Sequence, residues 1–319
     1  MKHIEASVIM PTLNKPERLL ITLTSFIHQT NANYEIIIVD GNYSKALKAL
    51  IDKVKLLCQV KYIKQNGNGR ANARNIGIKE AKGKIIIFAD DDLLVCPDFI
   101  EEHIKAHNNS QNVVVLGKLY QLYLSNLSSD LMSLRDQKGK KIIATRDICE
   151  IFDFVVEKGR EDPYFKSVRE MFNKNGGTDY RIPWIGFGTN NSSASKENII
   201  KAGLFDEKFK GWGYESIELG YRLFKEGLDF KYNSKAVNYH LEHSRNINEK
   251  MKELRRNLSY FIKKHYSMEL KLYKEFLYGK ISLECFNESV KENTDLRITG
   301  KDSGKIYYKL LRILDENAN

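Results

Sequence analysis

The chain has 319 residues, 42% of them hydrophobic and 29% charged, with a formal net charge of +10. This composition excludes a largely disordered chain, and no apolar run approaches the roughly 20 residues of a membrane-spanning helix. The first residues also lack the layout of a signal peptide, so we expect a cytoplasmic protein and leave association with a membrane open. The positive charge favours anionic partners, which include nucleic acids, membrane surfaces and phosphorylated small molecules.

Up to residue 92, short apolar strands alternate with amphipathic helices. Each strand is a run of β-branched residues that ends in turn residues, which is typical of buried parallel strands. In the first helix, Leu19, Leu23 and Phe26 have helical spacing and Pro16 lies near the first turn. The sequence therefore predicts an α/β fold with a mostly parallel central sheet and flanking helices. We expect strands at 6–12, 34–42, 58–65 and 84–92, and helices at 14–30, 45–57 and 69–83.

The second half of the chain has a less regular pattern. We interpret residues 118–180 as a variable insertion, which can have the role of shaping an acceptor site. Residues 229–243 have the composition of a further strand, and the sequence after them is helical and basic. We therefore predict a main domain over residues 1–244 and a helical extension over 245–319, which packs on the main domain or on a second subunit.

Polar side chains follow four of the predicted strands. They are Thr12 and Asn14, Asp40, Asn66, and the three aspartates at 90–92. Because the carboxyl ends of parallel strands meet at one edge of a sheet, where ligands of such folds bind, we expect these groups to face one polar ligand.

The three aspartates of "FADDDLL" are the strongest of these signals. Carboxylates crowded at the end of an apolar strand repel one another unless a cation is present. Oxygen ligands with room for water and phosphate suit Mg²⁺ or Mn²⁺. The alternative is a helix-capping or turn cluster, because aspartate is common at both places.

Two further features fit a nucleotide ligand. Asp40 can accept hydrogen bonds from a base or a ribose, or it can be an ordinary turn residue in "VDGN". Arg70 and Arg74 lie at the start of a helix after glycines, which is a suitable place for a diphosphate. The alternative for these arginines is a solvated basic helix.

Several of these motifs, in this order, resemble family 2 glycosyltransferases with the Rossmann-like GT-A fold. The last motif resembles the branch shared with chondroitin polymerases, the galactosyltransferase C-terminal type and polypeptide N-acetylgalactosaminyltransferases. The resemblance runs from about residue 7 to 243 and omits the middle insertion and the helical tail. It is carried by residues 7–26, 34–42, 69–94 and 211–223.

The resemblance implies a set of donor-binding residues. Thr12, Asn14 and Asp40 would hold the nucleotide, usually uridine, and Arg74 would lie near the diphosphate. Many relatives have a second aspartate after the residue that matches Asp40. This chain has Gly41 there, so the choice of nucleotide is left less certain.

The resemblance also implies a metal site. Asp90 and Asp92 would form the DXD motif, with Asp90 toward the ribose, Asp91 also among the donor-binding residues, and Asp92 on a Mn²⁺ or Mg²⁺ ion. His240 matches the late histidine that completes the metal site in this branch, and His243 competes with it for that role. Without the resemblance, His240 would be taken as a half-buried strand residue.

Glu215 and Ser216 stand where inverting relatives commonly have Glu-Asp, whose aspartate takes the proton from the acceptor hydroxyl. A serine cannot do this near neutral pH without a base of its own. We keep three interpretations, in this order: Glu215 is the displaced base; the reaction retains configuration, as in relatives with Glu-Asn; or the protein only binds.

Other residues near this motif have alternative interpretations. Glu218 and Arg222 are predicted to form an i,i+4 ion pair on a helix. Trp184 and Trp212 can stack on a sugar, and buried packing is the alternative for both.

The sequence thus predicts a metal-dependent glycosyltransferase of hexosyl or N-acetylhexosaminyl type, with inversion slightly favoured over retention. It would move a sugar from a UDP-sugar donor to a saccharide, lipid-linked or peptide acceptor. The alternative is a catalytically impaired nucleotide-sugar-binding protein. We expect no nucleic-acid partner, and we leave open a peripheral membrane contact and a homodimer through the C-terminal helices.

Overall fold

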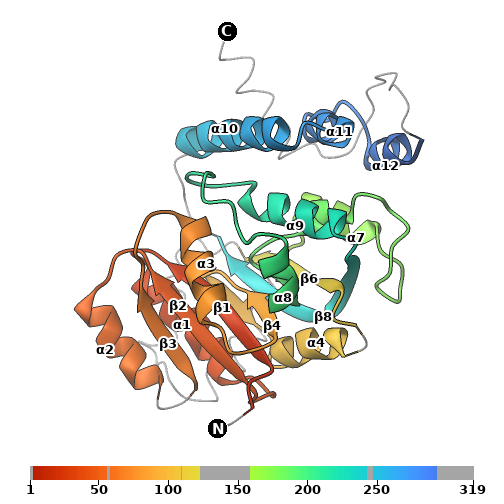
Figure 1. Ribbon diagram of the computed structural model, residues 1–319. Helices are drawn as coiled ribbons and strands as arrows, with labels where there is room; N and C mark the ends of the chain where they lie inside the picture. The colour runs from red at the N-terminus through yellow and green to blue at the C-terminus, as the bar shows by residue number, and fades with distance from the viewer. Residues whose placement is uncertain (1–2, 56–57, 109, 123–158, 243–246, 293–319) are drawn as a thin grey trace.

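The computed structural model describes residues 3–55, 58–108, 110–122, 159–242 and 247–292. A single eight-stranded sheet of order β3-β2-β1-β4-β7-β6-β8-β5 forms its centre (Figure 1). Neighbours pair in parallel in β3-β2-β1-β4 and in β6-β8, whereas β7 and β5 are antiparallel to their neighbours. The strands are β1 Ala6–Thr12, β2 Tyr34–Asp40, β3 Val60–Lys64, β4 Ile85–Phe88, β5 Leu93–Val95, β6 Val113–Leu122, β7 Ser192–Ser195 and β8 Asp229–Leu241.

Helices cover both faces of this sheet (Figure 1). The predicted α/β architecture is therefore confirmed. The helices are α1 Pro16–Ile27, α2 Lys45–Val54, α3 Arg70–Glu80, α4 Phe99–His107, α7 Pro163–Glu170, α8 Lys196–Lys201, α9 Glu215–Lys225, α10 Ile247–His265, α11 Met268–Leu277 and α12 Leu283–Glu292, with the short 3₁₀ helix η1 at Pro183–Gly186.

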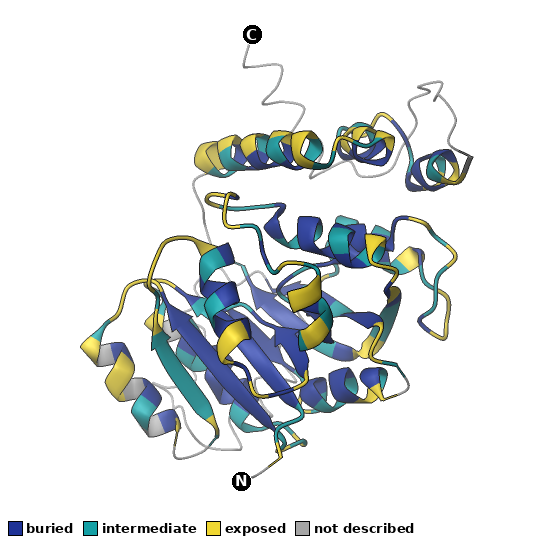
Figure 2. Cartoon of the chain, viewed as in Figure 1, coloured by how far each residue is buried: buried dark blue, intermediate teal, exposed yellow. Residues whose placement is uncertain are grey.

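The period-2 alternation of the strands divides the core into two layers. In β1, Ile9 packs in one hydrophobic cluster with residues of α3 and α9, while Val8 and Met10 pack in another with residues of α1, α2 and α4. Every residue of β2 is buried, as expected for a strand covered on both faces (Figure 2). The central strands are thus covered on both faces, and the carboxyl ends of the parallel strands lie at one edge of the sheet.

The helices α10 to α12 pack on the main domain. Leu254, Phe261 and Phe286 belong to the same cluster as Ile9 of β1, and Phe261 contacts the ring of Trp184. The carboxylate of Glu218 on α9 is fully buried and pairs with Lys264 of α10 at 2.8 Å. Apolar contact and a buried ion pair together fix α10 against α9.

The structure differs from the expected insertion at its start. Residues 118–122 continue strand β6, and residues 163–170 form helix α7. Strand β7 was also not predicted, because "SSAS" has none of the β-branched residues that mark a strand. Its Ser193 is buried between β4 and β6 and hydrogen-bonds to His103 and His107. Residues 123–158 lie outside the described part.

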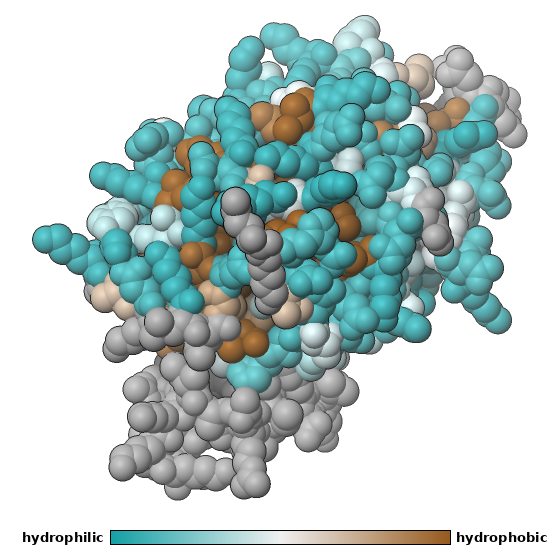
Figure 3. All heavy atoms as spheres, turned by 60° about the horizontal axis from the view of Figure 1, so that its bottom comes forward, coloured by the Kyte–Doolittle hydropathy of each residue, from teal (hydrophilic) through white to brown (hydrophobic). Residues whose placement is uncertain are grey.

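The face of the molecule in Figure 3 is largely polar. On the face shown in Figure 3, hydrophobic residues form small separate groups among hydrophilic ones. No helix in the described ranges is both long and apolar enough to span a membrane. The predicted peripheral membrane contact remains a prediction. Among the residues that the structure describes, the exposed large apolar ones are Leu13, Tyr43, Ile200, Ile247, Tyr266 and Met268.

Candidate active site

A pocket of about 260 Å³ lies at the carboxyl edge of the parallel strands. The register pairs Thr12 with Asp40 across β1 and β2, and the aspartates 90–92 follow β4, which pairs with β1 on its other side. Topology therefore brings residues that are far apart in the sequence to one place. The lining includes Thr12, Lys15, Gln65, Arg70, Arg74, Asp90, Asp91, Asp92 and Trp212.

Lys15 connects the two buried aspartates of the triple. Its Nζ lies 3.2 Å from Asp91 Oδ1 and 2.8 Å from Asp92 Oδ2. The Thr12 hydroxyl donates to Asp91 Oδ2 at 2.7 Å. Burial raises the pKa of Asp91, and the nearby Lys15 ammonium opposes that shift. One lysine thus supplies the compensating positive charge that a pair of buried carboxylates requires.

Asp92 also faces His240. The Asp92 Oδ1 and His240 Nε2 atoms are 3.2 Å apart, and the other ring nitrogen, Nδ1, lies 2.9 Å from Gln121 Oε1. Burial alone would lower the pKa of His240. The carboxylates of Asp92 and Glu242 have a larger, opposite effect, so the pKa is raised to about 9. The side chains of Asp92 and His240 thus face one another directly.

The pair Asp92 and His240 fits a divalent cation of the Mg²⁺ type. Two neighbouring ligands at about 2.1 Å from an octahedral ion lie about 3.0 Å apart, close to the separation in this site. Gln121 orients the imidazole from behind, as outer partners of metal-binding histidines do. Among the described residues, no group of three or more His, Cys, Asp or Glu side chains could hold a metal ion. Such ions usually take only one or two carboxylates and complete their shell with phosphates and water.

Arg74 links both sides of the pocket. Its Nη2 atom lies 3.3 Å from Asp90 Oδ1, and its Nη1 donates to Glu215 Oε1 at 3.0 Å. The second oxygen of Glu215 accepts from the backbone N–H of Gly213 at 3.1 Å. The side chains of Arg74 and Glu215 are 3% and 7% exposed, so this is a buried ion pair. The arginine fixes the direction of the Glu215 carboxylate relative to Asp90.

The loop before α9 needs an unusual backbone. Gly211, Gly213 and Tyr214 all have positive φ, at 72°, 101° and 68°. Glycine adopts this region without steric cost, which explains the "GWG" sequence. Trp212 between them is half-buried and lines the pocket. The turn directs Glu215, the first residue of α9, back toward Arg74.

Helix α10 supports this loop from the outside. Asn257 Nδ2 donates to the carbonyl groups of Trp212 and Gly213, at 3.2 and 3.0 Å. Glu253 accepts from the backbone N–H of Trp212 at 2.9 Å. The C-terminal extension therefore contributes to the position of Glu215, although it was predicted only as an appendage.

Other predicted residues have different surroundings. Trp184 is completely buried, and its Nε1 donates to Glu269 Oε1 at 2.8 Å, so it packs in the core and the expected sugar contact is corrected. Asp40 is buried, and its carboxylate accepts from Tyr62 and from the backbone of Asn42, which is the turn role. Asn14 is exposed and accepts from Asn42.

Asn66, which was expected to face the ligand, is exposed and is not among the residues that line the pocket. His243 lies outside the described residues, so only His240 can be placed. The predicted ion pair of Glu218 with Arg222 is confirmed at 2.7 Å.

Three residues of the site were missed by sequence reasoning. Lys15 follows a motif residue and was treated as part of a helix start, although a cation near a triple aspartate is what electrostatics requires. Gln65 lies at the end of β3 and donates to the carbonyl of Gly69 at 2.8 Å, which ties the strand to the arginine-bearing loop. Gln121 gave no signal, since its strand was not recognised.

Two family models match the chain. The model of glycosyl transferase family 2 matches residues 7–160, and that of the N-terminal domain of galactosyltransferase matches 169–244. YfnE of Bacillus subtilis, described as an uncharacterized glycosyltransferase, is 31% identical over 280 residues, which cover 82% of this chain and 71% of YfnE. This chain belongs to glycosyltransferase family 2, as the motifs predicted.

Two further comparisons add to this. Chondroitin synthase of Escherichia coli is 26% identical, and the match covers 98% of this chain but only 48% of the synthase. The solved structure of GalNAc-T7 with UDP, GalNAc and Mn²⁺ has a TM-score of 0.54 and 19% identity over 76% of this chain and 44% of that one. At this identity the likeness shows the fold alone, which is the GT-A fold.

Proposed function

We propose that the protein is a metal-dependent glycosyltransferase that uses a UDP-sugar donor. The observation that carries this proposal is the pairing of Arg74 with both Asp90 and Glu215 beside the Asp92 and His240 pair. Arg74, Asp90 and Asp92 line the pocket, and Glu215 and His240 lie directly behind Arg74 and Asp92. Groups suited to a diphosphate, a divalent cation and an acceptor hydroxyl are thus neighbours. The presence of UDP and Mn²⁺ in GalNAc-T7, which has the same fold, supports the choice of donor and metal.

In this proposal the residues near β1 and β4 hold the donor. Thr12 and Asp91 line the nucleotide side, and Arg70 and Arg74 provide guanidinium groups for the diphosphate. Asp92 and His240 would hold the Mn²⁺ or Mg²⁺ ion, which would neutralise charge on the leaving diphosphate. Asn14 and Asp40 keep their proposed role at the nucleotide through the shape of the turn that they support.

Glu215 is proposed to accept the proton of the acceptor hydroxyl. A carboxylate offers about four acceptor positions, and Arg74 and Gly213 use two of them. The fixed orientation is what a general base needs, since misplacement lowers the rate. This role corresponds to inversion at the sugar. Retention, with Glu215 contacting the acceptor without taking its proton, is the second candidate.

The acceptor is proposed to be a saccharide, because the chondroitin synthase that this chain resembles is named for making a polysaccharide. Trp212 at the rim of the pocket can stack on a sugar ring. The transferred group is proposed to be a hexose or an N-acetylhexosamine. Lipid-linked and peptide acceptors, a peripheral membrane contact and a homodimer through the C-terminal helices remain lesser proposals.

The test is release of UDP from a panel of UDP-sugars with Mn²⁺, Mg²⁺ or EDTA, for wild type, Asp92→Asn and Glu215→Gln. Hydrolysis of one donor that needs both the metal and Asp92 would support the proposal. Glu226→Gln, an exposed change at the other end of α9, is the matched control and should behave as wild type.

Three further results separate the alternatives. The anomeric configuration of the product, read by NMR, decides between inversion and retention. If UDP with Mn²⁺ binds but no donor turns over, either alone or with saccharide, lipid-linked or peptide acceptors, the protein is the impaired binding protein. If UDP with Mn²⁺ does not bind at all, the proposed function is wrong.

A further inference from the structure

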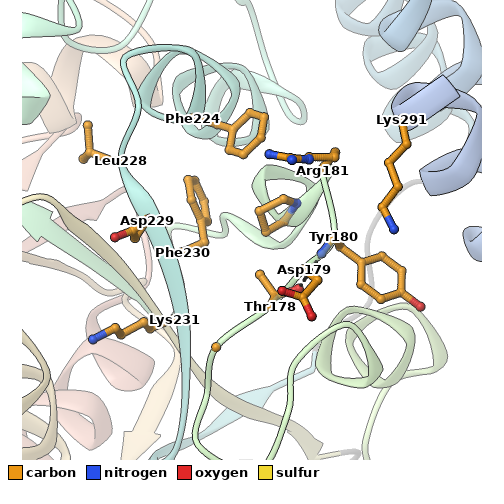
Figure 4. Close-up of a pocket in the computed structure, with 12 residues that line it drawn as sticks. Thr178, Asp179, Tyr180, Arg181, Phe224, Leu228, Asp229, Phe230, Lys231 and Lys291 are labelled. Atoms are coloured by element: carbon orange, nitrogen blue, oxygen red, sulfur yellow. Dashed lines mark hydrogen bonds between the residues drawn. The ribbon is translucent and has the colours of Figure 1, made fainter. Parts of the chain in front are cut away.

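A second pocket lies at the opposite end of α9 from Glu215. Its volume is about 570 Å³, more than twice the 260 Å³ of the first pocket. Its walls are residues 177–181, Pro183, the end of α9 at Phe224, the start of β8 and Lys291 of α12 (Figure 4). This volume is within the range of small-ligand sites, which is about 300–1,000 Å³.

One part of the pocket is apolar and aromatic. Leu228 and Phe230 are buried, Phe224 is half-buried, and the rings of Phe224 and Phe230 lie with their centres 6.1 Å apart. Tyr180 adds a hydroxyl group on the neighbouring segment. Aromatic faces beside hydroxyl and carboxylate groups are suited to the apolar face and the hydroxyl edge of a sugar ring.

The charged groups of this pocket are not engaged with one another. Within the described ranges, the side chains of Asp179, Arg181, Asp229 and Lys231 have no hydrogen bond or ion pair, while Lys291 pairs with Glu288 at 3.0 Å. In Figure 4 the Arg181 guanidinium extends toward Phe224. A planar guanidinium without a partner is a ready bidentate donor to a carboxylate.

We propose that this second pocket binds an acidic oligosaccharide, with a sugar carboxylate on Arg181 and a sugar ring against Phe224. Because Lys291 is paired with Glu288, the unpaired charged groups of the lining in the described ranges are two cations and two carboxylates. Of these, the Arg181 guanidinium is the donor suited to a sugar carboxylate, and the two aspartates offer acceptors for hydroxyl groups. The occupant is the part of the acceptor chain remote from the reacting end. The inference therefore rests on the proposed function of the first pocket.

Helix α9 sets the distance between the two pockets. Glu215 is its first residue, and Phe224 is nine residues later, so the two lie about 13 Å apart along the helix axis. This span separates the reacting end of an acceptor from its remote part. Short acceptors would occupy only the first pocket, and longer ones would gain affinity from the second through the linkage of two binding events.

The experiment measures binding of a hexasaccharide of alternating glucuronic acid and N-acetylhexosamine by calorimetry, with the full chain and without donor. A carboxyl-reduced form of the same hexasaccharide is the neutral control. Arg181→Gln should weaken binding of the acidic form about tenfold, as expected for loss of one charge-assisted pair. Phe224→Leu should weaken both forms. Lys208→Gln, an exposed charge change outside the pocket, should change neither.

The outcomes separate this inference from the proposed function. UDP with Mn²⁺ should bind all variants equally, because the first pocket is intact. If the acidic hexasaccharide does not bind, or binds with the same affinity to wild type and Arg181→Gln, the inference is overturned even where donor hydrolysis is seen. If the hexasaccharide binds through Arg181 but no UDP-sugar binds, the second site stands and the proposed function falls.

Discussion

The two pockets at the ends of α9 use their charged side chains in opposite ways. In the first, Lys15 pairs with Asp91 and Asp92, and Arg74 pairs with Asp90 and Glu215. In the second, Arg181 has no side-chain partner within the described ranges. A network that is already satisfied holds reacting groups in place, whereas exposed unpaired groups remain available to a ligand at little cost in desolvation.

The largest expected effect on activity is at Asp92. Asp92→Asn removes one of the two proposed metal ligands, and we expect transfer to fall at least about 100-fold, since even outer-shell changes cost 10- to 100-fold. The measurement is Mn²⁺ affinity by calorimetry together with UDP release. Asp52→Asn, on the surface of α2, is the control and should keep both. Unchanged Mn²⁺ affinity in Asp92→Asn would show that Asp92 is not a metal ligand.

The next effect concerns the buried pair of Arg74 and Glu215. Arg74→Met leaves a buried carboxylate without its guanidinium, and we expect a loss of about 3–5 kcal/mol in the free energy of unfolding. The double variant Arg74→Met with Glu215→Gln should recover part of that loss, because the uncompensated charge is gone. Urea unfolding of the three variants measures this. A cost near zero for Arg74→Met would mean that the network does not hold the site rigidly.

The strand ends of the first pocket could be predicted because their signals are local. Buried β-branched runs define β1, β2 and β4, and parallel pairing then requires Thr12 and Asp90–Asp92 to meet at one edge. The two tryptophans show the limit of this reasoning. The sequence offers packing and sugar contact equally for Trp184 and Trp212, and only the fold places one in the core and the other in the pocket.

The residues that were missed depend on contacts between distant elements. Gln121 acts through His240 across β6 and β8, and Asn257 of α10 holds the loop of Trp212. Neither residue belongs to a motif, and an amide side chain has no distinctive pattern in a sequence. The second pocket was missed for the same reason, since it joins residues 177–181 to α9, β8 and α12.

A third effect concerns Glu218, in the first turn of α9. Burial alone would raise the pKa of Glu218. Hydrogen bonds and charges from His265, Arg222 and Lys264 have a larger, opposite effect, so the pKa is lowered to about 2. A depressed carboxyl pKa stabilises the fold above the unfolded value of 4.5, and this contribution, about 3 kcal/mol, is lost as the pH falls from 4.5 toward 2.

Urea unfolding between pH 5 and about pH 2.5 tests this linkage. Wild type should lose stability over this range more steeply than Glu218→Gln, whose amide does not titrate. Glu226→Gln, exposed at the end of the same helix, should follow wild type. Parallel curves for wild type and Glu218→Gln would show that this residue does not fix α10 to α9 by charge.

The smallest expected effect is at Lys15 in the first pocket. Lys15 is 27% exposed at its side chain and competes with any metal ion for Asp92, so Lys15→Met should raise the Mn²⁺ affinity of the nucleotide-free protein by about three- to tenfold. Lys235→Met, which removes an exposed charge of β8, should leave that affinity unchanged. Calorimetry with Mn²⁺ alone distinguishes the two. Weaker Mn²⁺ binding in Lys15→Met would mean that the lysine supports the aspartates instead of competing with the metal for them, and the paired network would then be part of the metal site itself.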